Sequence, residues 1–266
     1  GELYPPKRGD EHRVANRSDF KKIEVGALIA GGGIAGSALF RYMADSGLNP
    51  VLVNADRGSS WRNIGGGRTA FSLPELAEIA EHNHAIFKEL QKISNIDYKT
   101  TRYINLAHDE PTFNALDASR AWSDAYMVDP KNFQKEISPY FSTKSKRYLG
   151  ALITNDCWQA TPGKVVDLIR NMGISAGGRI VEDCKVLEVM KEGSTYSILV
   201  LTHDKKYVEF RTEIFVNALG AGAGKICEGL GIHAGLYPVR HQAFITRRLP
   251  MLGKNGDSLD MLIDRQ

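Results

Sequence analysis

The chain has 266 residues, 42% of them hydrophobic and 24% charged, with a formal net charge of +3. These values are typical of a globular protein with one large domain or two modest ones. Lys and Arg are scattered and form no basic block interleaved with aromatic residues, so we expect no nucleic acid partner. No run of about 18 apolar residues occurs, so we expect no transmembrane span and a cytoplasmic location.

Residues 1–24 mix both charge signs and contain no apolar core of a signal peptide. We interpret them as an N-terminal extension that forms an exposed arm.

The residues that most often bind metals are spaced unfavourably for a metal site. Cys157, Cys184 and Cys227 lie far apart and form no C-x-x-C pair, which predicts buried reduced thiols. His82 and His84 are two apart on a predicted helix, so they point to different faces and cannot form an i, i+4 pair. We therefore expect neither a disulfide framework nor a metal site.

Residues 25–53 have the pattern of a nucleotide-binding β-α-β unit. An apolar run, 25–30, leads into Gly31, Gly33 and Gly36 at the spacing G-x-G-x-x-G, and PVLV at 50–53 predicts the second strand. Gly31 permits the turn, Gly33 lets a pyrophosphate approach the backbone, and Gly36 lets the helix lie close to the strand.

The helix that follows Gly33 begins with Ile34 and Ala35, and we expect its first N–H groups to point at an anion. Together with the three glycines, these residues form the predicted phosphate-binding part of the site.

Asn54 stands at the end of the second strand, where such a unit normally has an acid that accepts hydrogen bonds from ribose hydroxyls. Its amide oxygen can still accept, but the side chain is neutral. Asp56 has the same facing and is expected to restore part of the affinity, and Ala55 lies between them. On this reading Asn54→Glu strengthens cofactor binding. The competing reading is a cofactor with a 2′-phosphate, which an acid would repel.

Past residue 62 the chain loses the regular strand and helix alternation of a nicotinamide dehydrogenase. We expect an inserted second domain over 94–150, with a short helix around 129–141. The other predicted elements, in chain order, are a glycine-rich loop at 59–72, a long helix at 74–93, a helix from Thr161 to Gly173, an antiparallel meander of strands at 179–192, 195–203 and 207–211, and a strand within 212–223 that ends in glycines.

Over most of residues 25–250 the chain resembles FAD-dependent oxidoreductases of the D-amino acid oxidase and sarcosine oxidase superfamily. The resemblance is carried by the G-x-G-x-x-G unit, by SSWRNIGGGR at 59–68, by VNALGAGA at 216–223 and by YPVRHQAFIT at 237–246.

The resemblance implies an α/β fold with two interleaved domains. A Rossmann-like FAD-binding domain would comprise 25–93 and 151–236, and an α+β substrate domain would comprise 94–150 and 237–266. The chain stops at MLIDRQ, before a family member would supply its last strands. We therefore expect that the C-terminal part of the fold is missing, or that a partner subunit or oligomer completes it.

The resemblance also implies FAD as the cofactor and assigns further residues to it. The loop that passes beside the flavin ring matches Ser60, Arg62, Asn63, Gly65 and Gly66. The strand that approaches the adenine includes Val186, and the segment that closes over the nucleotide includes Ala218 and Gly220.

Arg240 and His241 are the candidates for catalysis, because the segment that matches them enters the substrate domain near the catalytic face. Strand alternation would give the two side chains opposite facings, so one of them would line the cleft. The alternative for His241 is a packed or solvent-facing side chain.

The implied reaction is oxidation of a small amine or amino acid by hydride transfer to flavin N5, with oxygen or another compound as the electron acceptor. One alternative is a flavin dehydrogenase of a 2-hydroxy acid or glycerol phosphate, because the same fold hosts both chemistries. The other is a non-catalytic flavoprotein or assembly factor of the same fold.

Overall fold

The computed structural model describes residues 20–55, 57–144, 147–242, 247 and 260–264. The chain divides into two compact units, Gly1–Arg57 with Arg170–Pro238 and Gly58–Ile169 with Val239–Gln266. Residues 58–93 and 151–169 therefore belong to the second unit by their contacts. The predicted division by function assigns those residues to the FAD-binding domain, and it stays a prediction.

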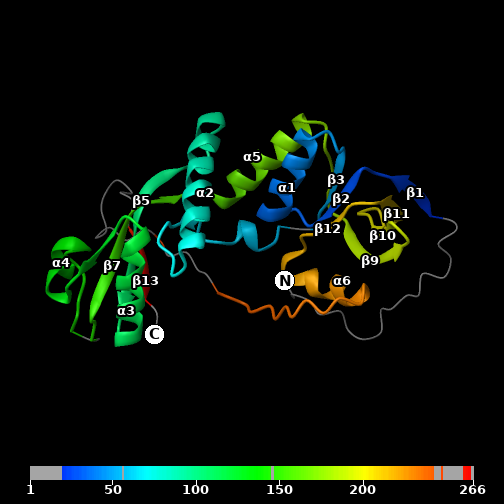
Figure 1. Ribbon diagram of the computed structural model, residues 1–266. Coiled ribbons are helices and arrows are strands. Elements are labelled where there is room, and N and C mark those ends of the chain that lie inside the picture. Colours follow the sequence, from blue (N-terminus) through cyan, green and yellow to red (C-terminus); the bar gives the residue numbers. More distant parts are fainter. Residues whose placement is uncertain (1–19, 56, 145–146, 243–246, 248–259, 265–266) are drawn as a thin grey trace. The chain divides into compact units, whose positions relative to one another are not determined.

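The predicted β-α-β unit is present in the first unit (Figure 1). Its strands belong to a four-stranded parallel sheet with the order β12-β2-β3-β8. Both ALIA and PVLV are buried along their whole length, as expected for parallel strands covered on both faces. The elements are β2 (Ala27–Ala30), α1 (Ile34–Asp45), β3 (Pro50–Val53), β8 (Arg179–Val181) and β12 (Phe215–Asn217).

Helix α1 packs through Phe40, which is fully buried against Ile29 and Leu52. The ring occupies space left by two glycines: a Cβ added at Gly173 or at Gly178 would lie 2.5 Å from a ring carbon of Phe40. The connection from α5 (Pro162–Ser175) to β8 is thereby held close to the helix of the nucleotide-binding unit.

The predicted antiparallel meander is confirmed as a second sheet of the first unit, with the order β1-β11-β10-β9. Its apolar face packs against the parallel sheet, so Leu28 and Val51 share one core with Ile198 and Phe210. The strands are β9 (Lys185–Glu192), β10 (Thr195–Leu201) and β11 (Tyr207–Thr212), and the short segments η5 (Gly220–Gly222) and α6 (Ala223–Gly229) follow β12.

Two expectations for this sheet are corrected. Residues Lys21–Glu24, predicted to belong to an exposed arm, form β1 and pair in parallel with β11. The single strand predicted at 179–192 is two strands, because Asp183 adopts a left-handed backbone conformation with φ of 52°. β8 pairs with β3 in the parallel sheet, whereas β9 pairs with β10 in the meander.

The second unit is built on a mixed sheet in which β13, β5, β7 and β4 are neighbours and β6 also pairs with β7. Its core contains Ile104, Leu106, Phe133 and Ile153. Its strands are β4 (Gly66–Gly67), β5 (Lys99–Ala107), β6 (Ala125–Val128), β7 (Gly150–Gln159) and β13 (Met261–Asp264), and its helical segments before α5 are η2 (Ser59–Trp61), α2 (Pro74–Ile93), α3 (Glu110–Ala118), η3 (Ser119–Trp122), η4 (Pro130–Asn132) and α4 (Phe133–Glu136).

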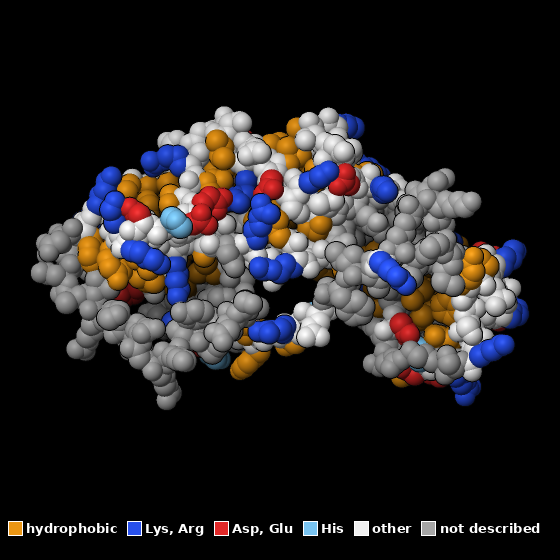
Figure 2. Space-filling view, turned by 180° about the vertical axis from the view of Figure 1, so that it is seen from behind, with side chains coloured by type: hydrophobic (Ala, Val, Ile, Leu, Met, Phe, Trp, Pro, Cys, Tyr) orange, Lys and Arg blue, Asp and Glu red, His pale blue; other side chains and the backbone are white. Residues whose placement is uncertain are grey.

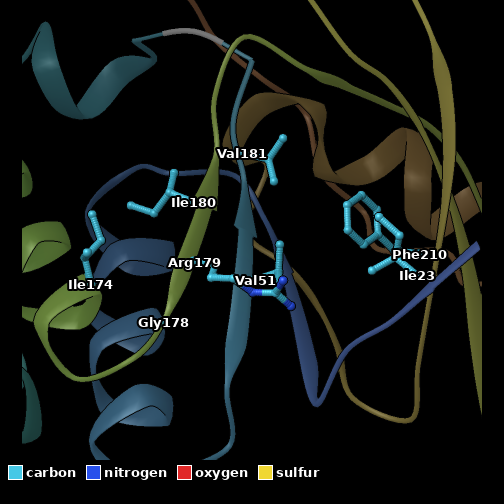
Figure 3. A pocket seen from close by; sticks show the side chains of 8 residues that line it. All are labelled: Ile23, Val51, Ile174, Gly178, Arg179, Ile180, Val181 and Phe210. Carbon is cyan, nitrogen blue, oxygen red and sulfur yellow. The ribbon is translucent and has the colours of Figure 1, made fainter.

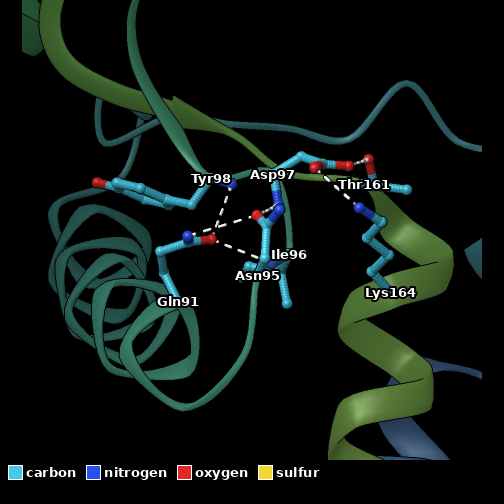
Figure 4. A network of polar contacts seen from close by, with 7 residues as sticks. All are labelled: Gln91, Asn95, Ile96, Asp97, Tyr98, Thr161 and Lys164. Atoms are coloured by element: carbon cyan, nitrogen blue, oxygen red, sulfur yellow. Dashed lines mark hydrogen bonds and ion pairs between the residues drawn. The ribbon is translucent and has the colours of Figure 1, made fainter.

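Helix α2 has the predicted bounds, and a polar network joins its C-terminal end to the start of α5 (Figure 4). The amide oxygen of Gln91 accepts from the N–H of Ile96 at 3.0 Å and from that of Tyr98 at 3.1 Å. The Asp97 carboxylate accepts from Thr161 Oγ1 at 2.6 Å and from Lys164 Nζ at 2.8 Å. These contacts lower the pKa of Asp97, with Lys164 as the largest cause.

The surface carries both charge signs. On the face shown in Figure 2, Lys and Arg side chains are spread among acidic and apolar ones. None of the helices in the described part of the chain is long and apolar enough to cross a bilayer.

Candidate functional site

The carboxyl ends of three neighbouring parallel strands carry the centre of the predicted site. The glycine turn follows β2, Asn54 follows β3 and Glu182 follows β8. In an open parallel sheet, ligands bind in the crevice at this edge.

The glycine turn is held by close contacts between backbone atoms. Gly31 has φ of 106°, and a Cβ added to it would lie 2.2 Å from the carbonyl oxygen of Ala218. The N–H of Ala218 in turn donates to the carbonyl of Ala30 at 2.8 Å. A Cβ at Gly36 would lie 1.9 Å from the carbonyl oxygen of Gly31. The structure thus brings Gly31, Gly36 and Ala218 together.

The N-terminal end of α1 is suited to an anion. Among the described residues no side chain caps this helix at Gly33, and its first turn contains no acid. Ile34 and Ala35 are exposed, and Gly33 is half-buried. N–H groups at such a helix end attract a phosphate.

Asn54 has a structural role that the sequence did not predict. Its side chain is 8% exposed. Its amide oxygen accepts from the N–H of Gly32 at 3.1 Å, and its amide nitrogen donates to Glu182 Oε2 at 2.9 Å. The other carboxylate oxygen of Glu182 forms an ion pair with Arg170. Asn54 therefore connects the glycine turn to a carboxylate on the next strand.

Of the two residues after Asn54, Ala55 is exposed. Asp56, predicted to assist Asn54, lies outside the described residues.

Sequence reasoning missed Glu182 because it placed that residue inside one long strand. The register pairs Val53 of β3 with Val181 of β8, so Asn54 and Glu182 occupy equivalent positions after adjacent parallel strands. The ladder continues at Asn54, whose N–H donates to the carbonyl of Val181 at 3.0 Å and whose carbonyl accepts from the N–H of Cys184 at 3.1 Å. The adjacent acids Glu182 and Asp183, in the middle of an otherwise alternating run, were the available signal of a break.

The predicted flavin loop belongs to the second unit and is shaped by Asn63. The amide nitrogen of Asn63 donates to the carbonyl of Ser60 at 2.7 Å, and its amide oxygen accepts from the N–H of Gly65 at 2.7 Å. Gly65 has φ of 72°, and a Cβ on it would lie 2.1 Å from the carbonyl oxygen of Ala160. Arg62 is exposed beside this turn.

The two glycines that form β4 face side chains. A Cβ on Gly66 would lie 2.6 Å from Met261 Cε, and one on Gly67 would lie 2.0 Å from the indole of Trp158. Both of these close contacts lie within the second unit.

Of the other residues assigned to the cofactor, Val186 lies in β9 opposite Val200 and packs on the core of the first unit. Gly220 begins η5 with φ of 56°. Their roles toward the cofactor stay predictions.

The prediction of a strand around Arg240 and His241 is wrong for the residues that the structure describes. Residues 233–242 form no helix or strand there, and both side chains are exposed. The alternation argument therefore does not apply to them. Residues 243–246, the end of the matching segment, lie outside the described residues.

Polar side chains lie beside the buried His84 in the second unit. His84 Nε2 lies 2.7 Å from the Tyr98 hydroxyl, and its Nδ1 lies 3.5 Å from Asp156. The imidazole stacks on Trp158 with ring centroids 4.4 Å apart. Burial lowers the pKa of His84, and the nearby Asp156 opposes this effect only in part.

A separate hollow of about 470 Å³ lies beside β8 in the first unit (Figure 3). Arg179 is the charged residue of its lining, and the remainder is apolar backbone and side chain, including Val51, Ile174 and Phe210. It contains none of the residues predicted to bind the cofactor.

Comparison with known proteins identifies the family. The model of the family described as FAD dependent oxidoreductase matches residues 27–264, and the chain belongs to that family. The resemblance seen in the sequence and the FAD cofactor are thereby confirmed.

The chain is 26% identical over 240 residues to the anaerobic glycerol-3-phosphate dehydrogenase subunit A1 of Haloferax volcanii. This match covers 79% of this chain and 39% of the relative. Among solved structures, L-proline dehydrogenase from P. horikoshii matches with a TM-score of 0.66 at 19% identity, over 80% of this chain and 56% of that one. L-alpha-glycerophosphate oxidase from Mycoplasma pneumoniae, with FAD bound, matches with a TM-score of 0.61 at 18% identity, over 79% and 57%.

The chain thus spans between 39% and 57% of the length of these three proteins. The structural matches confirm the predicted fold class. The residues at the strand ends also fit FAD, because the uncapped end of α1 suits a pyrophosphate and a carboxylate, Glu182, lies beside the expected ribose position.

Proposed function

We propose that this chain is the FAD-binding portion of an enzyme that oxidises a small amine or amino acid. The observation that carries the proposal is the glycine turn between β2 and α1 within a chain whose family is FAD-dependent. The bound FAD would accept a hydride from the substrate carbon at flavin N5.

The protein's own residues hold and orient the cofactor. The N–H groups that begin α1, from Gly33 to Gly36, bind the pyrophosphate, and Gly31 and Ala218 keep the turn close to the strand ends. The loop with Ser60, Arg62 and Asn63 contacts the flavin end. Val186 and Gly220 contribute contacts to the adenine and the nucleotide.

The substrate contacts we propose lie in the segment with Arg240 and His241. A guanidinium group suits a substrate carboxylate, because it can donate two parallel hydrogen bonds to it. Two solved structures that share the fold, named as L-proline dehydrogenase and glycine oxidase, support an amino acid as the substrate.

A second candidate is oxidation of glycerol phosphate or a 2-hydroxy acid. It is favoured by the similarity to a glycerol-3-phosphate dehydrogenase subunit and by the shared fold of an L-alpha-glycerophosphate oxidase. In this case Arg240 would pair with a phosphate or carboxylate in the same way.

Anaerobic reduction of the flavin tests the proposal. The FAD-loaded protein is mixed with amino acids, N-methyl amino acids, glycerol 3-phosphate and 2-hydroxy acids, and the visible absorbance of oxidised flavin is followed. Bleaching by an amino acid or amine supports the first candidate. Bleaching by glycerol 3-phosphate or a hydroxy acid alone supports the second, and bound FAD that no compound reduces favours a non-catalytic flavoprotein.

The electron acceptor is a separate question, which aerobic turnover answers. Peroxide formed in proportion to substrate identifies an oxidase. Turnover that requires an added dye or quinone identifies a dehydrogenase.

A further inference from the structure

We infer that Glu182 supplies the carboxylate that binds the ribose hydroxyls of the FAD adenosine, in place of the missing acid at position 54. The inference rests on the proposed binding of FAD by the first unit. It assigns a cofactor contact to a residue outside the glycine motif and outside the strand that normally provides it.

Glu182 occupies the position after β8 that corresponds to Asn54 after β3. β3 and β8 are parallel neighbours, and Figure 3 shows Arg179, Ile180 and Val181 of β8 beside Val51 of β3. Side chains at equivalent positions of parallel neighbours share one face of the sheet. Glu182 therefore emerges on the same face as Asn54, at the same end of the sheet.

A hydrogen bond joins the side chains of Asn54 and Glu182. Asn54 Nδ2 donates to Glu182 Oε2 at 2.9 Å. The carboxylate of Glu182 therefore lies within one hydrogen-bond length of the side chain at position 54. The Asn54 amide oxygen is held by the N–H of Gly32. Asn54 thus serves as a positioning residue that fixes the carboxylate of Glu182 next to the glycine turn.

Glu182 is more accessible to a ligand than Asn54. Asn54 is 8% exposed, whereas the side chain of Glu182 is 49% exposed. Each carboxylate oxygen has two lone pairs, so an oxygen already bonded to Asn54 or Arg170 can still accept from a hydroxyl. The exposed side of Glu182 is available to a ligand, and the amide of Asn54 is largely enclosed.

The charge of Glu182 is balanced by Arg170. A carboxylate close to a doubly charged pyrophosphate is disfavoured unless a cation balances it. Arg170 provides that cation: its side chain is 9% exposed and forms an ion pair with Glu182. The ion pair leaves no net negative charge from the Glu182 and Arg170 side chains at the strand ends.

The test compares two ligands. Apo-protein is titrated with FAD and with the FAD analogue whose adenosine ribose lacks the 2′ and 3′ hydroxyls, and both Kd values are measured by quenching of flavin fluorescence. A charge-assisted pair of hydrogen bonds predicts that the parent protein binds FAD about tenfold more tightly than the analogue. Glu182→Gln should bind both ligands equally well. A variant that is partly unfolded changes both Kd values by the same factor, because both ligands bind the same folded fraction. The ratio of the two Kd values is therefore unaffected.

Two further variants make the result specific. Asp183→Asn removes the charge next to Glu182. Asp183 is exposed and has a left-handed backbone conformation, which asparagine tolerates. This variant should keep the tenfold preference for FAD over the analogue. The exchange Asn54→Asp with Glu182→Gln moves the carboxylate to the enclosed position after β3 and leaves an amide at the exposed position after β8. It should not restore the preference that Glu182→Gln loses, because residue 54 is only 8% exposed. Asn54→Asp alone places two carboxylates together and should weaken FAD binding, which reverses the gain expected from sequence for Asn54→Glu.

The inference is overturned if Glu182→Gln keeps the parent's preference for FAD, or if the parent shows no preference. Either result leaves the proposed function intact, because FAD still binds. A parent protein that binds neither ligand would instead contradict the proposed function.

Discussion

Two pairs of glycines in this chain, one at the turn after β2 and one in β4, differ in what lies against them. In the first unit, Gly31 and Gly36 face backbone carbonyl oxygens, with an added Cβ at 2.2 Å and 1.9 Å from them. In the second unit, Gly66 and Gly67 face the side chains of Met261 and Trp158. Backbone atoms at a strand end cannot move without loss of the sheet, whereas side chains can be exchanged.

This difference indicates how each pair of glycines should respond to substitution. A contact between backbone atoms requires glycine whatever the surrounding side chains are. A contact with a side chain requires glycine only while that side chain is large. Gly31 and Gly36 should therefore be intolerant of every substitution, whereas Gly66 and Gly67 should tolerate a substitution that is matched by a smaller partner.

The largest effect is expected at Gly36. Gly36→Ala places a methyl group 1.9 Å from the carbonyl oxygen of Gly31, so α1 must separate from β2. We expect a loss of more than about 3 kcal/mol in the free energy of unfolding, together with loss of FAD binding. Denaturant unfolding and FAD titration measure both quantities.

Gly47→Ala is the matched control for this variant. Gly47 has φ of 77°, but no atom of the described residues lies within 4 Å of an added Cβ. It should cost about 1 kcal/mol through backbone strain alone and leave FAD binding unchanged. Equal costs for the two variants would show that the backbone contact at Gly36 is unimportant.

A smaller effect, and one that can be rescued, is expected at Gly67. Gly67→Ala meets the indole of Trp158 at 2.0 Å and should cost about 1–3 kcal/mol of unfolding free energy. Trp158→Leu opens that space but removes the stacking partner of His84.

The double variant should therefore be less destabilised than the sum of the two single variants, by about 1 kcal/mol. Strict additivity of the three unfolding free energies would contradict the account of the glycine pair in β4.

A pH effect of smaller size is expected from His84. Burial lowers its pKa below the ordinary value of 6.5, so the folded protein resists a proton that the unfolded chain accepts. The stability that comes from burying neutral His84 is fully present above pH 6.5, and it is lost as the pH falls from that value through the folded pKa. The unfolding free energy should therefore fall on acidification below pH 6.5, and less so in His84→Gln.

His82→Gln serves as the control, because His82 is exposed on the same helix. It should keep the pH dependence of the parent. A parent protein and His84→Gln with the same pH profile would show that His84 is not the group responsible.

The sequence predicted those parts of the fold that depend on neighbours along the chain. The turn at Gly31, the helix at 74–93 and the meander follow from local periodicity and from the conformational freedom of glycine. β1 was missed because its strand character comes from pairing with β11, which is remote in the sequence.

The candidate site shows the same limit. The glycine turn could be recognised from its spacing, but the partner of Asn54 lies 128 residues away. Position 54 therefore looked like a weakened ribose contact when read alone. The structure makes it one member of a chain of contacts from Gly32 through Glu182 to Arg170. This series of contacts depends on the register of β3 and β8, which no local sequence pattern specifies.

The most direct test of the account is the choice of cofactor, because the glycine turn and the strand ends are proposed to hold the adenosine and pyrophosphate half of FAD. Apo-protein is titrated separately with FAD, FMN and NADP. We predict that FAD binds, that FMN, which lacks the adenosine half, binds at least about tenfold more weakly, and that NADP does not compete with FAD. FMN bound as tightly as FAD, or NADP bound with FAD excluded, would contradict the account.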